Sequence, residues 1–157
     1  VVQSACGVAT PIEFPLAIRY ATLLAPVERW LGSFRWIVVA AIGHVGATLL
    51  VAMLIWAMVK LGWVGDEATR GVDVGVSYAF GAVAGVFAYL LRGRLRRLYP
   101  AALLGVFALV LIVAPSFTAV GHLLAILIGL ALGWLLQRRV PLPAAAAPLY
   151  PRPLWRP

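Results

Sequence analysis

The stretch GHLLAILIGLALGW, Gly121–Trp134, decides the fold, because it is apolar along its whole length except for His122. It lies within a longer run, Phe117–Leu136, whose length suits a helix that crosses about 30 Å of hydrocarbon. The whole chain agrees with this interpretation, since 64% of its 157 residues are hydrophobic and only 11% are charged. Such a composition excludes the soluble globular class. The sequence therefore predicts an all-α polytopic membrane protein.

Apolar runs of similar length recur between clusters of charge or proline, and about five transmembrane helices are expected. The four runs before the last are Val8–Trp30, Trp36–Trp63, Val74–Leu91 and Tyr99–Ala114. The first is the weakest, because Glu13, Arg19 and three prolines interrupt it. We expect residues 1–137 to form one transmembrane domain and the proline-rich residues 138–157 to form a cytoplasmic tail that cannot hold a helix.

The arginines predict how the helices are oriented. Arg92, Arg94, Arg96 and Arg97 lie between the third and fourth runs, and Arg138 and Arg139 follow the fifth. Short cytoplasmic loops retain Lys and Arg, so both segments are expected in the cytoplasm and the acidic loop 64–73 outside the cell. The first residue then lies outside as well, and a further helix is expected upstream of it. The protein is accordingly expected to be a multi-pass protein of the cell membrane. The excess of 13 Lys and Arg over 5 Asp and Glu is interpreted as a topology signal and an attraction to anionic lipid, not as a nucleic-acid surface.

Two polar side chains are expected at one level of the membrane. Ser77 lies about four residues inside the outer end of its helix and His122 about five residues inside the outer end of the last helix, or roughly 6 to 8 Å at 1.5 Å per residue. A nucleophilic hydroxyl and its general base need this proximity. The alternative is that Ser77 is a small packing residue and that His122 bonds a backbone carbonyl. Because an ionisable side chain within a membrane span is costly, His122 favours a functional interpretation.

The sequence around both residues resembles the rhomboid family of intramembrane serine proteases. The last run is similar to the last rhomboid helix, in which small residues follow a catalytic histidine at helical spacing, here Ala125, Gly129 and Gly133. VERWLGSFRWIVVA, residues 27–40, resembles the junction of the second and third helices, and GVSY, residues 75–78, resembles the nucleophile motif G-x-S-G. The resemblance implies a rhomboid-like helical bundle with a sixth helix upstream. It also implies a catalytic Ser77–His122 dyad supported by Gly75 and Tyr78, and close helix contacts at the small residues.

Two departures from the family pattern bear on activity. Tyr78 replaces the glycine that usually follows the nucleophile, and its ring is expected to crowd the attacking oxygen. The family also carries a His and an Asn that donate hydrogen bonds to the oxyanion, and losing one such donor costs roughly a hundredfold or more in rate. This chain has Ile12, Glu13, Pro15 and Leu16 in that region, with Gln3, Ser4, Thr10 and the backbone N–H groups near Ser77 as substitute donors.

His44 is the second imidazole expected within the membrane. It lies deeper than the Ser77 level, roughly 13 Å from the inner edge at 1.5 Å per residue, which makes it a poor partner for Ser77. Gly43, Gly46 and Ala47 favour a close helix contact, across which His44 is expected to bond Thr48, another hydroxyl or a carbonyl. Two histidines at different depths and a single cysteine predict neither a metal site nor a cofactor.

Three functional hypotheses follow from these patterns. The first is an intramembrane serine peptidase that cleaves transmembrane segments, and the second is an inactive rhomboid-like protein that binds membrane helices. The third, a small transporter or channel, lacks the paired intramembrane acids and inverted repeat that would favour it. The expected partners are the lipid bilayer and transmembrane substrates or clients, with no nucleic acid. The sequence predicts no oligomeric state.

Overall fold

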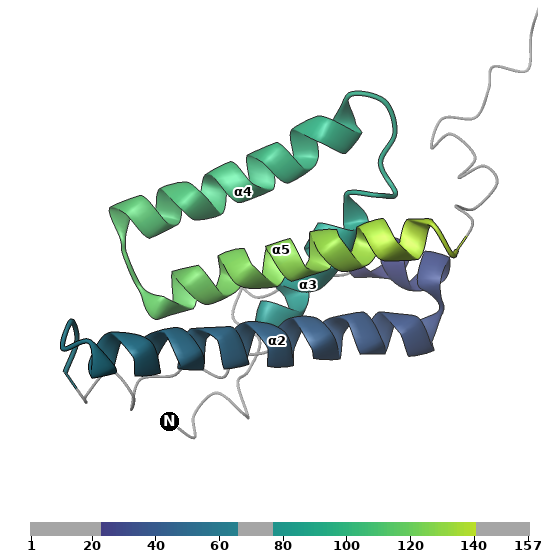
Figure 1. The fold of residues 1–157 in the computed structure, drawn as a ribbon. Helices are drawn as coiled ribbons and strands as arrows, with labels where there is room; N and C mark the ends of the chain where they lie inside the picture. Colours follow the sequence, from purple (N-terminus) through teal and green to yellow (C-terminus); the bar gives the residue numbers. More distant parts are fainter. Residues whose placement is uncertain (1–22, 66–76, 141–157) are drawn as a thin grey trace, which may run out of the picture.

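The computed structural model describes residues 23–65 and 77–140, which form helices joined by short turns and loops (Figure 1). After a short helical segment at residues 23–31 come α2 (Ser33–Lys60), α3 (Ser77–Phe87), α4 (Leu95–Val113) and α5 (Phe117–Gln137). α2, α4 and α5 are long and apolar enough to cross a membrane. The predicted class, an all-α membrane bundle, is therefore confirmed. Most of the first expected run, Val8–Trp30, lies outside the described residues.

The largest differences from the expected helix boundaries lie on either side of the connection between α3 and α4. α3 ends at Phe87 and not at Leu91, because residues 88–90 form a turn and Gly93 adopts a positive φ of 60° that allows the chain to reverse. α4 begins at Leu95, four residues earlier than the hydrophobicity predicts. Arg96 and Arg97 therefore lie within the first turn of a helix. The hydrophobic pattern does not predict this turn, because these two residues are charged.

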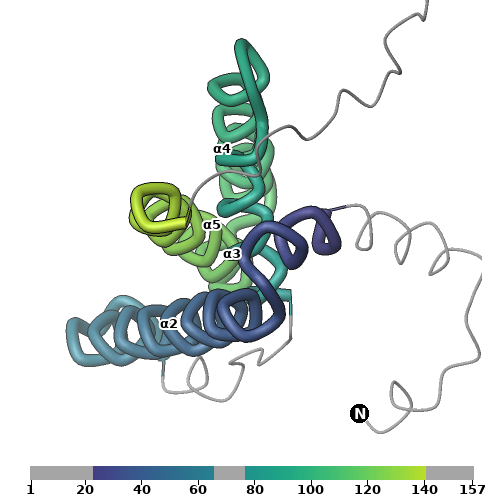
Figure 2. Tube along the Cα trace, turned by 90° about the vertical axis from the view of Figure 1, so that its right-hand side faces the viewer, coloured from purple at the N-terminus to yellow at the C-terminus, as the bar shows by residue number. Residues whose placement is uncertain are grey.

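α3 is the central element of the bundle. Figure 2 shows it surrounded by α2, α4, α5 and the segment 23–31. Its described residues extend about 16 Å at 1.5 Å per residue, roughly half the hydrocarbon thickness. It packs most extensively against α5 and also against α2. α4 has no buried residue; it packs mainly against α5 and contacts α3 through Tyr99.

The buried residues form two clusters that fix the direction of α3. Tyr78, near its start, packs with Ala47 of α2 and Ala125 of α5. Val83 and Val86, nearer its end, pack with Val39 close to the start of α2 and with a group of residues from the segment 23–31. α3 therefore runs parallel to α5 and antiparallel to α2.

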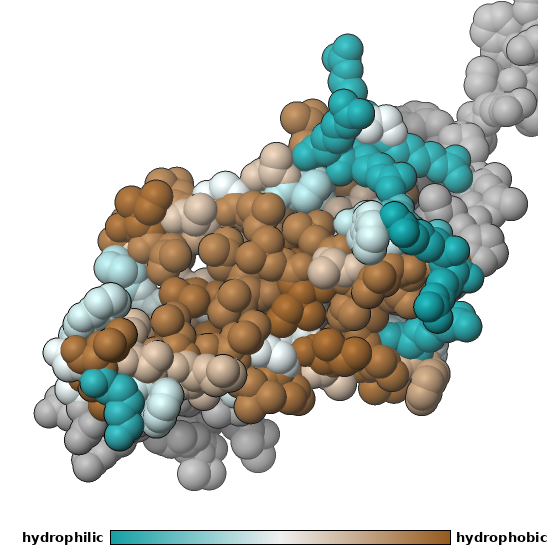
Figure 3. All heavy atoms as spheres, in the orientation of Figure 1, coloured by the Kyte–Doolittle hydropathy of each residue, from teal (hydrophilic) through white to brown (hydrophobic). Residues whose placement is uncertain are grey.

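The outer surface is largely apolar, as expected for a protein surrounded by lipid. Figure 3 shows hydrophobic side chains over most of the face in view, with hydrophilic residues gathered at one end, where α4 begins and α5 ends. Outward-facing side chains of α4 such as Ile112 and Val113 are more than three-quarters exposed. Lys60 lies over Trp56 at one end of the bundle, and Arg138 lies over Trp134 at the other. Such aromatic and basic pairs typically lie at the two membrane interfaces.

Candidate active site

A cavity of about 180 Å³ lies where α3, α4 and α5 meet the segment 23–31. Its lining comprises Leu23, Leu24, Ser77, Phe80, Gly81, Ala84, Leu103, Phe107, His122 and Ile126. Among these lining residues, Ser77 and His122 are the two with polar side chains. The structure therefore places the two sequence-predicted site residues at one cavity with otherwise apolar walls.

Helical periodicity explains which residues reach the cavity. Ser77, Gly81 and Ala84 follow the i, i+4, i+7 spacing, so one face of α3 forms one wall. His122 and Ile126 contribute an i, i+4 pair from α5. The common direction of α3 and α5 brings the early part of each helix to this cavity.

The orientation of His122 is defined by a hydrogen bond within its own helix. Its Nδ1 lies 2.8 Å from the carbonyl oxygen of Thr118, one turn earlier. A carbonyl oxygen can only accept, so Nδ1 carries the proton and donates it. In the neutral imidazole Nε2 then has the free lone pair, as a general base requires. The same hydrogen bond is also what a histidine with a purely structural role would need, because it satisfies Nδ1 within the helix.

Two aromatic rings hold the imidazole from different directions. Phe107 of α4 stacks on His122 with a centroid distance of 5.5 Å and an interplanar angle of 19°. Tyr78 of α3 meets it nearly edge-on, at 5.1 Å and 82°. Aromatic contacts of this kind contribute about 0.5–1.5 kcal/mol each. Phe107 was not predicted from the sequence as a site residue. Its i, i+4 spacing from Leu103 on an apolar helix is the one pattern that could have indicated that it shares a helix face with another lining residue.

Tyr78 does not occupy the position that the sequence suggested. Its ring is 2% exposed, belongs to the buried cluster between α2 and α5, and is absent from the cavity lining. Successive helical residues point about 100° apart, so the residue after Ser77 faces a different side of α3. Gly121 leaves room for the ring, because any side chain there would overlap it. The bulk of the Tyr78 ring therefore lies in the buried cluster and against His122, not in the lining of the Ser77 cavity.

Small residues allow α3 to approach its neighbours closely. A Cβ at Gly129 of α5 would lie 2.7 Å from the Cα of Ala82, and one at Gly81 would lie 3.1 Å from the Cβ of Ala125. Gly133 is packed in the same way against the ring of Tyr89. These contacts set the spacing of α3 and α5, and hence the level at which Ser77 and His122 lie.

Small residues of α2 make the corresponding contacts, and they surround His44. Gly43 packs against Ala82, and a Cβ at Gly46 would lie 3.1 Å from the side chain of Ile128. Thr48 donates its hydroxyl to the backbone oxygen of His44 at 2.8 Å, so it does not bond the imidazole. Within the described residues, Nδ1 of His44 is buried without a hydrogen-bond partner. Its ring faces Tyr78 at a centroid distance of 6.4 Å.

Several residues singled out from the sequence lie outside the described ranges. They are Gly75 and the residues considered for the oxyanion, Gln3, Ser4, Thr10, Ile12, Glu13, Pro15 and Leu16. In the part of the chain that the structure describes, no group of three or more His, Cys, Asp or Glu could hold a metal ion.

Comparison with known proteins agrees with this architecture. The family model described as rhomboid-like protein matches residues 1–141, which is most of the chain. No curated protein and no solved structure gives a match. The extent of the family match, together with the apolar helical bundle, shows that this membrane protein belongs to the rhomboid-like family.

Proposed function

We propose that this chain is an intramembrane serine peptidase in which Ser77 is the nucleophile and His122 the general base. One observation supports this proposal above all: both side chains line a single apolar cavity, with Nδ1 of His122 committed to the Thr118 carbonyl. Nε2 is then the ring nitrogen that remains for Ser77. The backbone carbonyl of Thr118 orients the imidazole, as a carboxylate does in a catalytic triad.

The reaction follows from these assignments. The Oγ atom of Ser77 adds to a peptide carbonyl carbon while its proton moves to Nε2 of His122. The imidazolium then protonates the leaving amine, and the C–N bond breaks. Water attacks the acyl carbon and gives a proton to Nε2. The imidazolium then returns this proton to Oγ of Ser77 as the ester C–O bond breaks, which releases the carboxylic acid and restores the enzyme. Apolar walls strengthen the electrostatic interactions of these charged intermediates.

The proposed substrates are transmembrane segments of other proteins. The cavity lies within a bundle whose outer surface is apolar, so its natural access is from the bilayer. We place the Ser77 level near the outer face and the chain end beyond α5 in the cytoplasm. The support for this orientation is that the segments around residues 92–97 and 138–139, which carry arginines, lie at one end of the bundle.

Covalent labelling with a fluorophosphonate probe tests the nucleophile. The full chain in mild detergent is treated with the probe, and the modified peptide is identified by mass spectrometry. We expect labelling at Ser77, its loss in Ser77→Ala, and its retention in Ser33→Ala, which removes an exposed hydroxyl bonded to Glu28. A chain that remains unlabelled, or one labelled equally in Ser77→Ala, would contradict the proposal.

A second pair of variants separates chemistry from packing at the base. His122→Phe keeps a ring between Phe107 and Tyr78 but removes Nε2, so it should stay folded and lose cleavage of a transmembrane substrate. Ser77→Ala combined with His122→Phe should be scarcely less active than either variant alone, because members of one nucleophilic unit act non-additively.

A second candidate function is that of an inactive family member that captures membrane helices. It is favoured by Ile12, Glu13, Pro15 and Leu16, which offer no side-chain donor where the family pattern has an oxyanion His and Asn. In that case wild type and Ser77→Ala should copurify with the same membrane proteins and leave them equally intact. Cleavage by wild type alone would exclude this function.

A further inference from the structure

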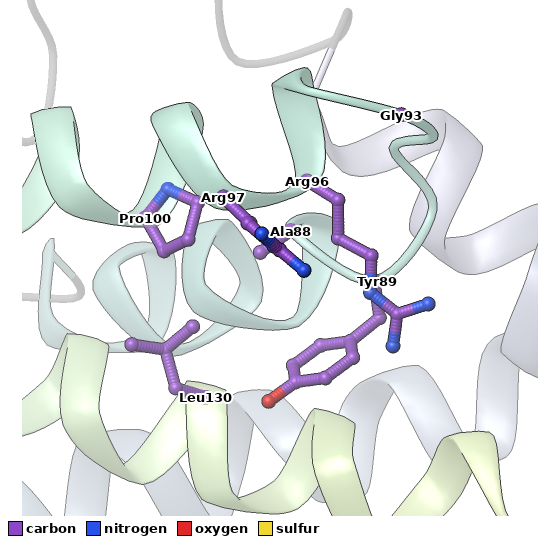
Figure 4. A pocket seen from close by; sticks show the side chains of 7 residues that line it. All are labelled: Ala88, Tyr89, Gly93, Arg96, Arg97, Pro100 and Leu130. Carbon is purple, nitrogen blue, oxygen red and sulfur yellow. The ribbon is translucent and has the colours of Figure 1, made fainter.

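A second and larger cavity, of about 480 Å³, lies at the end of the bundle where α4 begins. Its lining comprises Ala88, Tyr89, Gly93, Arg96, Arg97, Pro100 and Leu130. Figure 4 shows the side chains of Arg96 and Arg97 extending from the first turn of α4 towards α5, with Tyr89 and Leu130 opposite them. The volume lies within the range of about 300–1,000 Å³ typical of small-molecule sites.

In the part of the chain that the structure describes, no acidic side chain neutralises the positive charge of this cavity. Arg96 donates to the side-chain oxygen of Gln137 and lies over the ring of Tyr89, 5.5 Å from its centroid. Both partners are neutral, so they orient the guanidinium and leave its charge uncompensated. Glu28 is the sole acidic residue in the ranges 23–65 and 77–140, and it accepts a hydrogen bond from Ser33.

The backbone around the cavity also favours an anion. Gly93, with its positive φ of 60°, reverses the chain at the rim of the cavity. α4 starts directly afterwards, and its N-cap residue Arg94 makes no side-chain capping bond. The first backbone N–H groups of a helix and its dipole both attract negative charge. They add to the attraction of Arg96 and Arg97, whose planar guanidinium groups match the oxygens of a phosphate.

One wall of the same cavity is apolar, which distinguishes it from a site for a small free ion. Ala88, Pro100 and Leu130 form this wall. Beyond it the outer surface of α4 carries exposed apolar side chains along its length, among them Val106 and Leu109. A ligand that fits both parts has an anionic phosphate at the membrane surface and hydrocarbon that continues along a helix into the bilayer.

We propose that this cavity binds the headgroup phosphate of an anionic glycerophospholipid, with an acyl chain along α4. The bound phosphate joins the start of α4 to the connection that follows α3, and the acyl chain covers a helix that has no buried residue of its own. This proposal does not depend on the chemistry of Ser77 and His122, because it uses other residues at the opposite end of α3.

Lipid titration of the full chain in uncharged detergent tests the site. Binding of phosphatidylglycerol and of zwitterionic phosphatidylcholine is measured by native mass spectrometry, together with the melting temperature. The double variant R96Q/R97Q should raise the dissociation constant for phosphatidylglycerol about thirtyfold, as expected for two arginines near an anionic headgroup. The matched control is R92Q/R94Q, which removes the same charge from the same connection outside the cavity lining and should change the constant less than about threefold.

A charge-neutral variant and two soluble anions complete the test. Leu130→Trp fills the apolar wall and should also weaken phosphatidylglycerol binding while the net charge is unchanged; it serves as well if R96Q/R97Q does not fold. Equal losses in R96Q/R97Q and R92Q/R94Q would overturn the proposal, because they would indicate general attraction to a basic surface. Inorganic phosphate or glycerol 3-phosphate binding as tightly as the lipid would overturn the lipid assignment in favour of a free phosphate.

Discussion

Gly85 of α3 provides a sharp test of the helix packing that brings Ser77 and His122 to one cavity. A Cβ added there would lie 2.6 Å from the carbonyl oxygen of Ile126 and 2.8 Å from the backbone nitrogen of Leu130. Both atoms belong to the backbone of α5, so no side-chain rotation can relieve the overlap. Ordinary van der Waals contact begins at 3.4 Å, so α3 and α5 would have to separate by 3.4 − 2.6 = 0.8 Å.

Gly85→Ala should therefore lower the free energy of unfolding by about 1–3 kcal/mol, the usual cost of overpacking. Gly105→Ala is the matched control, because a Cβ at that position of α4 meets no atom within 4 Å. Alanine is about 1 kcal/mol better than glycine within a helix, so Gly105→Ala should leave the protein equally or more stable. The two identical substitutions are thus expected to act in opposite directions.

Thermal unfolding in detergent, followed by circular dichroism and by loss of a monodisperse elution peak, measures both variants. Gly85→Ala should also reduce fluorophosphonate labelling of Ser77, because the contact between α3 and α5 sets its level relative to His122. If Gly85→Ala melted at the same temperature as Gly105→Ala, the close approach of α3 to α5 would be refuted. The shared cavity of Ser77 and His122 would then lose its structural basis.

Three further predictions concern the ring contacts and the topology. Tyr78→Gly should lower the free energy of unfolding by about 3–5 kcal/mol through the cavity it leaves. Tyr78→Phe, which keeps the ring, should lower it by about 1 kcal/mol. Equal melting temperatures of the two variants would contradict the buried position of the ring. Phe107→Leu should slow labelling of Ser77 about two- to tenfold through loss of its stacking on His122, with little change in melting temperature. The topology is tested with single cysteines after the native cysteine is replaced by serine. A cysteine at Ala114 should react with an impermeant maleimide in intact cells, whereas one at Leu95 should react only after permeabilisation. The reverse pattern would contradict the proposed orientation.

The membrane class could be predicted from sequence because it depends on local properties. Apolar length identifies α2 and α5 regardless of their neighbours, and clusters of arginine identify one end of the bundle. The expectation that Ser77 and His122 lie at a common level rests on their distances to the ends of their helices. Each of these inferences needs only the rise per residue and the position of charges along the chain.

The positions of individual rings could not be predicted in the same way. Tyr78 follows Ser77 directly, and a motif written as letters in a row suggests that the two side chains are neighbours. The helical rotation of about 100° per residue sends Tyr78 into the core with Ala47 and Ala125 instead. Phe107 contacts His122 from a helix whose placement depends on few contacts, and hydrophobic periodicity carries no information about such a placement.

The way in which α4 is attached separates the stability of the bundle from the integrity of the candidate site. α4 buries no residue, and specific side-chain contacts hold it to the other helices: Phe107 stacks on His122 and the hydroxyl of Tyr99 donates to the carbonyl of Ala84 at 3.2 Å. The buried clusters belong to the other helices. Substitutions at Phe107 or Tyr99 should therefore alter the walls of the Ser77 cavity while α2, α3 and α5 remain packed, whereas Gly85→Ala should disturb both together. This difference allows a loss of labelling to be assigned either to the site or to the fold.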